Sequence, residues 1–158
     1  MDTEKLLRCL KEHDVRFVVI GATAFPVHGY ARATLDIDLF IQPTRANAAR
    51  TWRALQAFGY DMTDASVEEL LNKKILIREY RLATDIHPFV KGITFEKVWK
   101  DKVKAKVGRT FAWFASLENL IRMKRAAGRP KDLEDLNYLT PLRRKRLSLQ
   151  PTKSDRTC

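Results

Sequence analysis

Val18-Val19-Ile20-Gly21-Ala22-Thr23-Ala24 is an apolar run that ends in small residues, and a second apolar run follows at Leu35-Asp36-Ile37-Asp38-Leu39-Phe40-Ile41. Nearly unbroken apolar runs of this length are typical of strands in a sheet that is covered on both faces. We therefore expect strands over 16–20 and 36–42. The small residues predict a bend into a short helix over 22–30, where Pro26 is tolerated in the first turn.

The second run carries two aspartates, Asp36 and Asp38. Because side chains alternate along a strand, these carboxylates should project from one face. Two adjacent carboxylates repel each other, and a divalent cation relieves that repulsion. The N-terminus of the helix after Gly21 offers backbone N–H groups to a phosphate. Together these features indicate metal-assisted phosphoryl chemistry on a nucleotide.

The remaining pattern alternates between helices and strands. Helices are expected over 2–13, 44–58, 66–72, 93–100, 116–127 and from 129 to at least 139. A short strand is expected between residue 60 and the helix that begins at 66. Further strands are expected over 75–80, 82–90, 102–107 and 109–115. Thr44 and Ser116 are predicted N-caps, and Gly59 and Gly128 predicted helix ends. Lysines alternate with apolar residues over 102–107, a pattern that protects an edge strand or contacts nucleic acid.

Composition limits the class of protein. The chain has 158 residues, enough for one domain, and no run long enough to span a membrane. Its first residues lack the basic and then apolar segments of a signal peptide. Its two cysteines indicate neither a disulfide framework nor a zinc site. We expect a cytoplasmic protein. The net charge of +11, with six basic residues and one acid over 142–158, favours an RNA, DNA or other acidic partner, or a tail that maintains solubility.

Several short motifs occur in a fixed order: Gly21-Ala22-Thr23-Ala24, His28-Gly29, Arg32-Ala33-Thr34 and Asp36-Ile37-Asp38. In this order they resemble the signature of the nucleotidyltransferase superfamily, and the closest likeness is to the small bacterial branch of AbiEii-type and minimal nucleotidyltransferases. The resemblance covers about Val15 to Leu139. It implies an α+β fold in which helices flank a mixed sheet and C-terminal helices close the site. The corresponding division is one domain over 1–146 and a basic tail over 147–158.

The resemblance also implies the site residues. Asp36, Asp38 and a third carboxylate, Asp85, would hold the metal and act in catalysis. The nucleotide phosphates would contact Gly21, Ala22, Thr23, Arg32, Thr34 and Lys124, with Asp132 as the acidic companion of Lys124. Ordinary roles stay open beside these: a helix cap for Thr23 and surface positions for Asp85 and Lys124. His87 should face the same way as Asp85, but neither it nor His28 is expected to be a metal ligand.

The implied reaction moves a nucleoside monophosphate from a nucleoside triphosphate to a hydroxyl group, with Mg²⁺ or Mn²⁺ as cofactor. The acceptor implied is RNA such as tRNA, favoured by the basic charge, or a partner protein, within a toxin–antitoxin system; a small molecule is a third option. Ala22 replaces the serine or glycine of many superfamily members and so removes a hydroxyl near the triphosphate. A non-catalytic module that binds nucleic acid or a partner on the same fold is the alternative.

Overall fold

The structure is a computed structural model that describes residues 2–150. Within them, six strands form one mixed sheet in the order β3-β4-β2-β1-β6-β5. Their bounds are β1 Phe17–Ile20, β2 Asp36–Ile41, β3 Ile75–Ile77, β4 Ala83–His87, β5 Val103–Val107 and β6 Thr110–Phe114. β2 pairs antiparallel with β1 and parallel with β4, whereas β1 and β6 are parallel. The α+β fold with a mixed sheet is confirmed.

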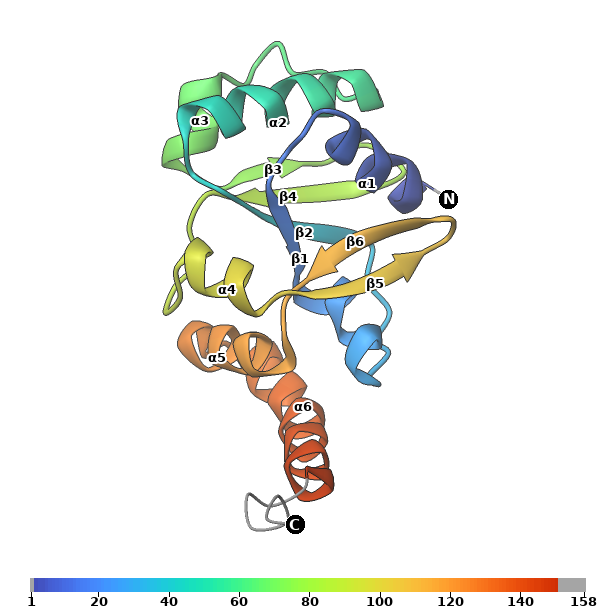
Figure 1. The fold of residues 1–158 in the computed structure, drawn as a ribbon. Coiled ribbons are helices and arrows are strands. Elements are labelled where there is room, and N and C mark those ends of the chain that lie inside the picture. Colours follow the sequence, from blue (N-terminus) through green and yellow to red (C-terminus); the bar gives the residue numbers. More distant parts are fainter. Residues whose placement is uncertain (1, 151–158) are drawn as a thin grey trace, which may run out of the picture.

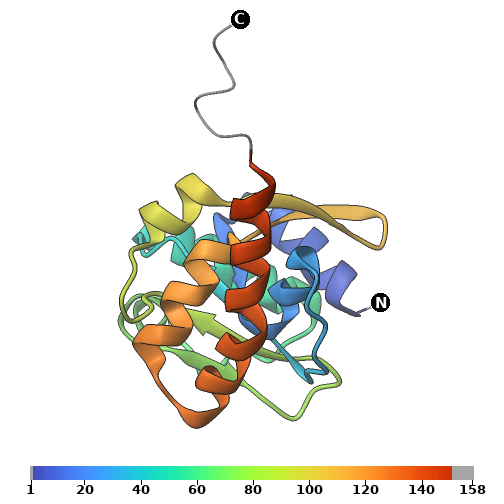
Figure 2. The ribbon, with the colours of Figure 1, turned by 90° about the horizontal axis from the view of Figure 1, so that it is seen from below.

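Helices cover the sheet on both sides (Figures 1 and 2). On one side lie α1 (Asp2–Glu12), α2 (Arg45–Phe58) and α3 (Val67–Asn72); on the other lie α4 (Phe95–Asp101), α5 (Leu117–Ala127) and α6 (Pro130–Leu149). The four residues of β1 are all buried, as the apolar run predicts. On α1 the apolar stripe of Leu6, Leu7 and Leu10 is fully buried against this core.

Local signals set most helix ends. The side chains of Thr44 and Ser116 accept hydrogen bonds from backbone N–H groups three residues on, as predicted for N-caps. Gly59 and Gly128 adopt the left-handed conformation at the ends of α2 and α5. Several details differ from the expectation. β3 and β4 are shorter than the strands predicted over 75–80 and 82–90. The helix after β1 is a 3-10 helix, η1 (Gly21–His28), and residues 60–66 form turns and irregular backbone in place of a short strand.

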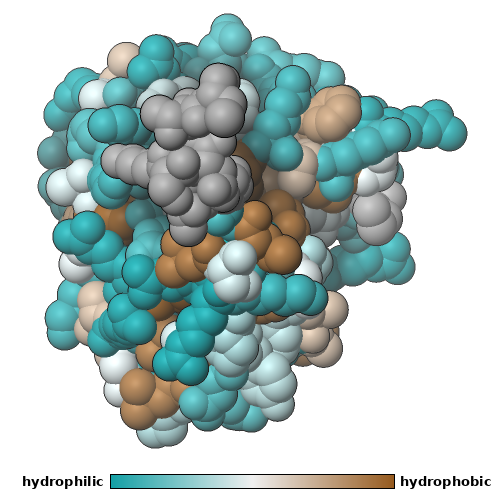
Figure 3. Space-filling view, turned by 60° about the horizontal axis from the view of Figure 1, so that its bottom comes forward, coloured by the Kyte–Doolittle hydropathy of each residue, from teal (hydrophilic) through white to brown (hydrophobic). Residues whose placement is uncertain are grey.

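The C-terminal part of the described chain is one long helix. α6 continues to Leu149, past the boundary at 146 that the sequence suggests, and most of the basic tail lies outside the described residues. Figure 3 shows a surface in this region that is mostly hydrophilic but crossed by a band of hydrophobic residues. Among the described residues, none of the helices combines the length and apolar character that a membrane crossing requires.

Candidate active site

The pairing of β2 with β4 determines which side chains meet. Asp38 is the register partner of Asp85, and Phe40 is the partner of His87. In parallel strands, partnered side chains project from the same face, so Asp38 and Asp85 lie side by side. Asp36 precedes this pair on the same face and is partnered by Ala83. The two strands thus bring carboxylates from distant parts of the sequence to one face of the sheet.

A compact group of potential ligand atoms results. One ligand atom each of Asp38, Asp85 and His87 lies within 4.8 Å of the others. The Nε2 atom of His87 is 2.8 Å from Oδ1 of Asp38. Carboxylate oxygens and an imidazole nitrogen suit a divalent cation. His87, which is not expected to be a ligand, thus belongs to this group, whereas Asp36 does not.

Asp36 is held by two threonines instead. The hydroxyl of Thr34 donates to Oδ1 of Asp36 at 2.7 Å and so orients its carboxylate. The hydroxyl of Thr23 donates to the main-chain oxygen of Asp36 at 3.1 Å. That bond ties η1 to β2, and the N-cap position of η1 is occupied by Ile20. Thr23 therefore joins two elements of the site and does not cap a helix.

Gly21 lies against Asp38. Its φ is +68°, and a Cβ atom at this position would lie 2.5 Å from Oδ2 of Asp38. Only glycine fits both the backbone conformation and this approach. Ala22 is buried, with 7% of its surface exposed, so its methyl group packs into the core. The turn between β1 and η1 thus presents backbone, and no side chain, to the Asp38 carboxylate.

Two cations accompany Asp85, whose own surface is only 4% exposed. Arg78 Nη1 contacts Oδ1, and Lys74 Nζ lies 3.2 Å from Oδ2. Burial alone would raise the pKa of Asp85, but the hydrogen bond from Arg78 and the charge of Lys74 hold that pKa below its usual range. Asp85 is therefore a buried carboxylate that is paired with two cations.

A buried ion network lies beside these carboxylates. Lys124 Nζ contacts Asp132 at 2.9 Å and Asp135 at 3.1 Å, and both carboxylates are 1% exposed. Arg32 pairs with Asp135 at 2.9 Å, and Arg129 pairs with Asp132 at 2.7 Å. Burial raises the pKa of Asp132, but hydrogen bonds from Arg129 and Lys124 outweigh it and lower that pKa to about 2. The three cations exceed the two carboxylates, so the network keeps a positive charge.

Asp135 belongs to this network but is not among the predicted site residues, since from the sequence it is expected only to cap a helix or pair locally. It connects Arg32, on the loop before β2, to Lys124 on α5. Its spacing of three from Asp132 places both on one face of α6. Asp132 does accompany Lys124, as the resemblance implies, but it shares that position with Asp135.

Most of the predicted site residues line one of two hollows, whereas Asp85 lines neither of them. The smaller, of about 120 Å³, is lined by Gly21, Asp38, His87, Lys124 and Asp132 among others. The larger, of about 510 Å³, is lined by Ala22, Thr23, Arg32, Thr34 and Asp36 among others. Asp36 and Asp38 therefore face different spaces, although they project from one strand face.

Comparison with known families gives a match over residues 2–143 to the family described as "Nucleotidyltransferase of unknown function" (DUF6036). The chain belongs to this nucleotidyltransferase family. A search of curated proteins gave no match. Membership of this family indicates an enzyme that uses a nucleoside triphosphate. Nucleotidyltransferases generally use divalent metals, and the group formed by Asp38, Asp85 and His87 has the ligand atoms to bind one.

Proposed function

We propose that this nucleotidyltransferase moves a nucleoside monophosphate from a nucleoside triphosphate to an acceptor hydroxyl, with Mg²⁺ as its metal. The observation that carries the proposal is the pairing of Asp38 with Asp85 directly beside the Gly21 turn. This places backbone N–H groups, which attract phosphate, next to a carboxylate group that suits a divalent cation. The family membership supports the class of reaction.

Each residue then has a distinct role. Asp38, Asp85 and His87 would hold the metal, which would supply positive charge to the phosphates, and Asp36, which lies outside this group, would join them as a ligand when the reactants bind. Lys124 lines the same hollow as Asp38 and adds positive charge for the polyphosphate. Arg78 and Lys74 hold the pKa of Asp85 below its usual range, and this carboxylate would bind the metal and orient the acceptor hydroxyl. Thr34 fixes the carboxylate of Asp36.

The reaction is an in-line displacement. The acceptor oxygen forms a bond to the α-phosphorus, and the bond from that phosphorus to the bridging oxygen breaks. Pyrophosphate leaves with the electron pair, and the hydroxyl proton passes to solvent. The hollow beside Asp36, lined by Arg32, gives room for a second reactant next to the one that contacts Lys124. Positioning and electrostatics supply most of the catalysis in such a site.

RNA such as tRNA is our favoured acceptor, and a partner protein is the second choice. The net charge of +11 supports an acidic acceptor. The resemblance to AbiEii-type and minimal nucleotidyltransferases supports both acceptors and a role within a toxin–antitoxin system. A tRNA acceptor predicts that transfer weakens steeply with salt, since released counterions drive the binding of a polyanion.

A transfer assay tests the proposal. Purified protein is incubated with each labelled nucleoside triphosphate, Mg²⁺, and either bulk tRNA or a protein acceptor. We expect label in the acceptor, and none after Asp36→Asn combined with Asp38→Asn. EDTA should also abolish transfer. Absence of transfer from all four nucleotides to both acceptor classes, with RNA binding that the double variant retains, would instead support a non-catalytic module that binds nucleic acid.

A further inference from the structure

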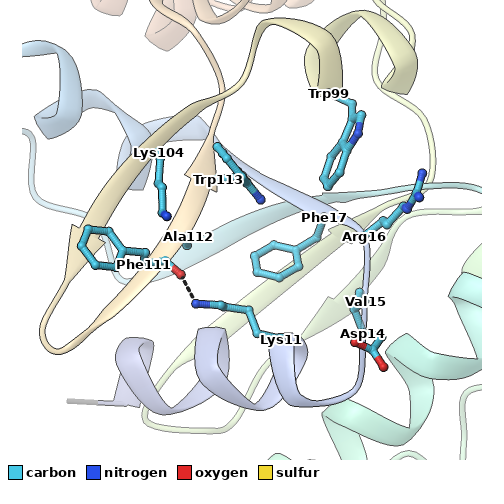
Figure 4. A pocket seen from close by; sticks show the side chains of 10 residues that line it. All are labelled: Lys11, Asp14, Val15, Arg16, Phe17, Trp99, Lys104, Phe111, Ala112 and Trp113. Carbon is cyan, nitrogen blue, oxygen red and sulfur yellow. Dashed lines mark hydrogen bonds between the residues drawn. The ribbon is translucent and has the colours of Figure 1, made fainter.

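A groove of about 460 Å³ lies away from the carboxylates, where β5 and β6 meet the start of β1 and the helix α4 (Figure 4). Its walls hold the rings of Phe17, Trp99, Phe111 and Trp113. Phe17 begins β1, whereas Gly21 follows its last residue, so the groove and the carboxylates lie at opposite ends of that strand. At about 3.3 Å per residue they are about 13 Å apart along it.

Strand pairing places cations between the aromatic rings. Lys104 is the register partner of Trp113, and Lys106 is the partner of Phe111. Partnered side chains share a face, so aromatic rings and lysines alternate across one face of this two-stranded ribbon. Phe111 is 45% exposed and Trp113 is 36% exposed. Protection of the edge strand explains the lysines but not the two exposed rings between them.

The charge of the groove is predominantly positive. Lys11, Arg16 and Lys104 line it, and Asp14 is the one acidic residue in its lining. Within residues 2–150, none of these three cations forms a salt bridge with a carboxylate. Lys11 donates instead to the main-chain oxygen of Phe111 at 2.7 Å, as Figure 4 shows. The groove is therefore lined by more positive than negative charge.

Cations also hold the rings in place. The guanidinium of Arg16 lies 5.6 Å from the ring centroid of Trp99. The ammonium of Lys102, next to the groove, lies 4.0 Å from the centroid of Trp99 and 4.5 Å from that of Trp113. Contacts of this kind fix aromatic rings in an exposed site. The two indoles therefore share contact with one ammonium group, that of Lys102.

We propose that this groove binds single-stranded nucleic acid, with bases stacked on Trp113 and Phe111 and phosphates beside Lys104, Lys11 and Arg16. Base stacking on aromatic side chains combined with a basic groove is the chemistry by which proteins bind single strands without reading their sequence. A purely acidic partner would need the cations but not the rings. The inference concerns binding alone and holds whether or not the carboxylates transfer a nucleotide.

Fluorescence anisotropy with labelled RNA and DNA strands of about ten nucleotides tests the proposal. The measurements use the full chain carrying Asp36→Asn and Asp38→Asn, without nucleotide or Mg²⁺, so they do not depend on transfer. We expect Trp113→Ala to weaken binding about ten-fold, as expected for one lost stacked base. Lys104→Gln should reduce the slope of log affinity against log salt by about 0.7, the value for one phosphate contact on a single strand.

Control variants remove an aromatic ring and a lysine elsewhere. Tyr138→Ala removes an aromatic ring that is 52% exposed on α6, and Lys73→Ala removes a lysine near the opposite edge of the sheet. Both controls should bind like the parent. If Trp113→Ala lowers stability, Lys104→Gln still tests the proposal, since the side chain of Lys104 is exposed and its loss should not unfold the protein. Equal competition by polyglutamate or inorganic polyphosphate, or unchanged binding and salt slope in the groove variants, would overturn the proposal.

Discussion

A Cβ atom on Gly21 would lie 2.5 Å from Oδ2 of Asp38. The turn after β1 can therefore lie against the Asp38 carboxylate only when residue 21 is glycine. The φ of +68° adds a second reason, because side chains disfavour this conformation. The turn and the carboxylate therefore form one unit, and a change in either should alter the other.

Gly21→Ala should reduce nucleotidyl transfer at least about 100-fold, because the new methyl group displaces the Asp38 carboxylate and small misplacements in active sites cost this much. Gly59→Ala is the matched control. Gly59 has a φ of +119°, but no atom lies within 4 Å of its Cβ position. Both variants should lose about 1 kcal/mol of stability through backbone strain. Equal transfer rates in the two variants would show that the approach to Asp38 has no catalytic importance.

Thr34→Val should lower kcat about ten-fold and leave the thermal midpoint unchanged. The exposed hydroxyl donates to Oδ1 of Asp36 and orients this carboxylate, and a ten-fold fall in rate corresponds to about 1.4 kcal/mol of lost transition-state stabilisation. Thr34→Ser keeps that donor and should restore the parent rate. Steady-state kinetics on the three proteins check this, and a serine variant as slow as the valine variant would argue against the orienting role.

Arg78→Ala should tighten the binding of Mn²⁺ about five-fold, since the guanidinium that contacts Oδ1 of Asp85 would no longer oppose a cation there. Isothermal titration calorimetry measures the change. Arg45→Ala, which removes an exposed arginine paired with Glu68, is the control and should bind Mn²⁺ like the parent. Weaker Mn²⁺ binding in Arg78→Ala would mean that this arginine positions Asp85 for the metal.

Asp132→Asn should lower the free energy of unfolding by about 2 kcal/mol at pH 7, because a shift of the pKa from 3.8 to about 2 corresponds to nearly two units at about 1.4 kcal/mol each. The folded pKa lies below the unfolded one. The stabilising contribution is therefore fully present above pH 3.8 and is lost as the pH falls through about 2.

Urea denaturation at several pH values from 7 downward measures this effect. The gap between parent and Asp132→Asn should stay constant down to about pH 4 and then narrow. The exposed Asp64 supplies the control, and Asp64→Asn should unfold like the parent across the whole range. A gap that is constant at all pH values would place the stabilisation in packing, not in the ionised carboxylate.

Features with short-range causes were predictable from the sequence. The caps at Thr44 and Ser116 and the ends at Gly59 and Gly128 each depend on a few neighbouring residues, and each is confirmed. The common face of Asp36 and Asp38 follows from the two-residue period of a strand. The 3-10 form of η1 was not predictable, because the spacing that starts a helix near Gly21 does not distinguish it from an α-helix.

Long-range contacts explain what the sequence could not reveal. The place of His87 beside Asp38 depends on the register of β4 against β2, which no local pattern specifies. Arg32 and Asp135 are paired although they are separated by 103 positions in the chain. Such contacts arise when α6 packs against the loop before β2, and a linear pattern carries no signal of that packing.

The parallel register of β2 and β4 also determines which errors of strand pairing during folding are compatible with an intact site. A slip of one residue would turn the Asp85 carboxylate to the opposite side and carry Thr84, which is fully buried and bonded to Tyr60, out of its place. Copies with such a slip would therefore lack the paired carboxylates and be inactive. An active molecule is one in which β2 and β4 have paired in the native register.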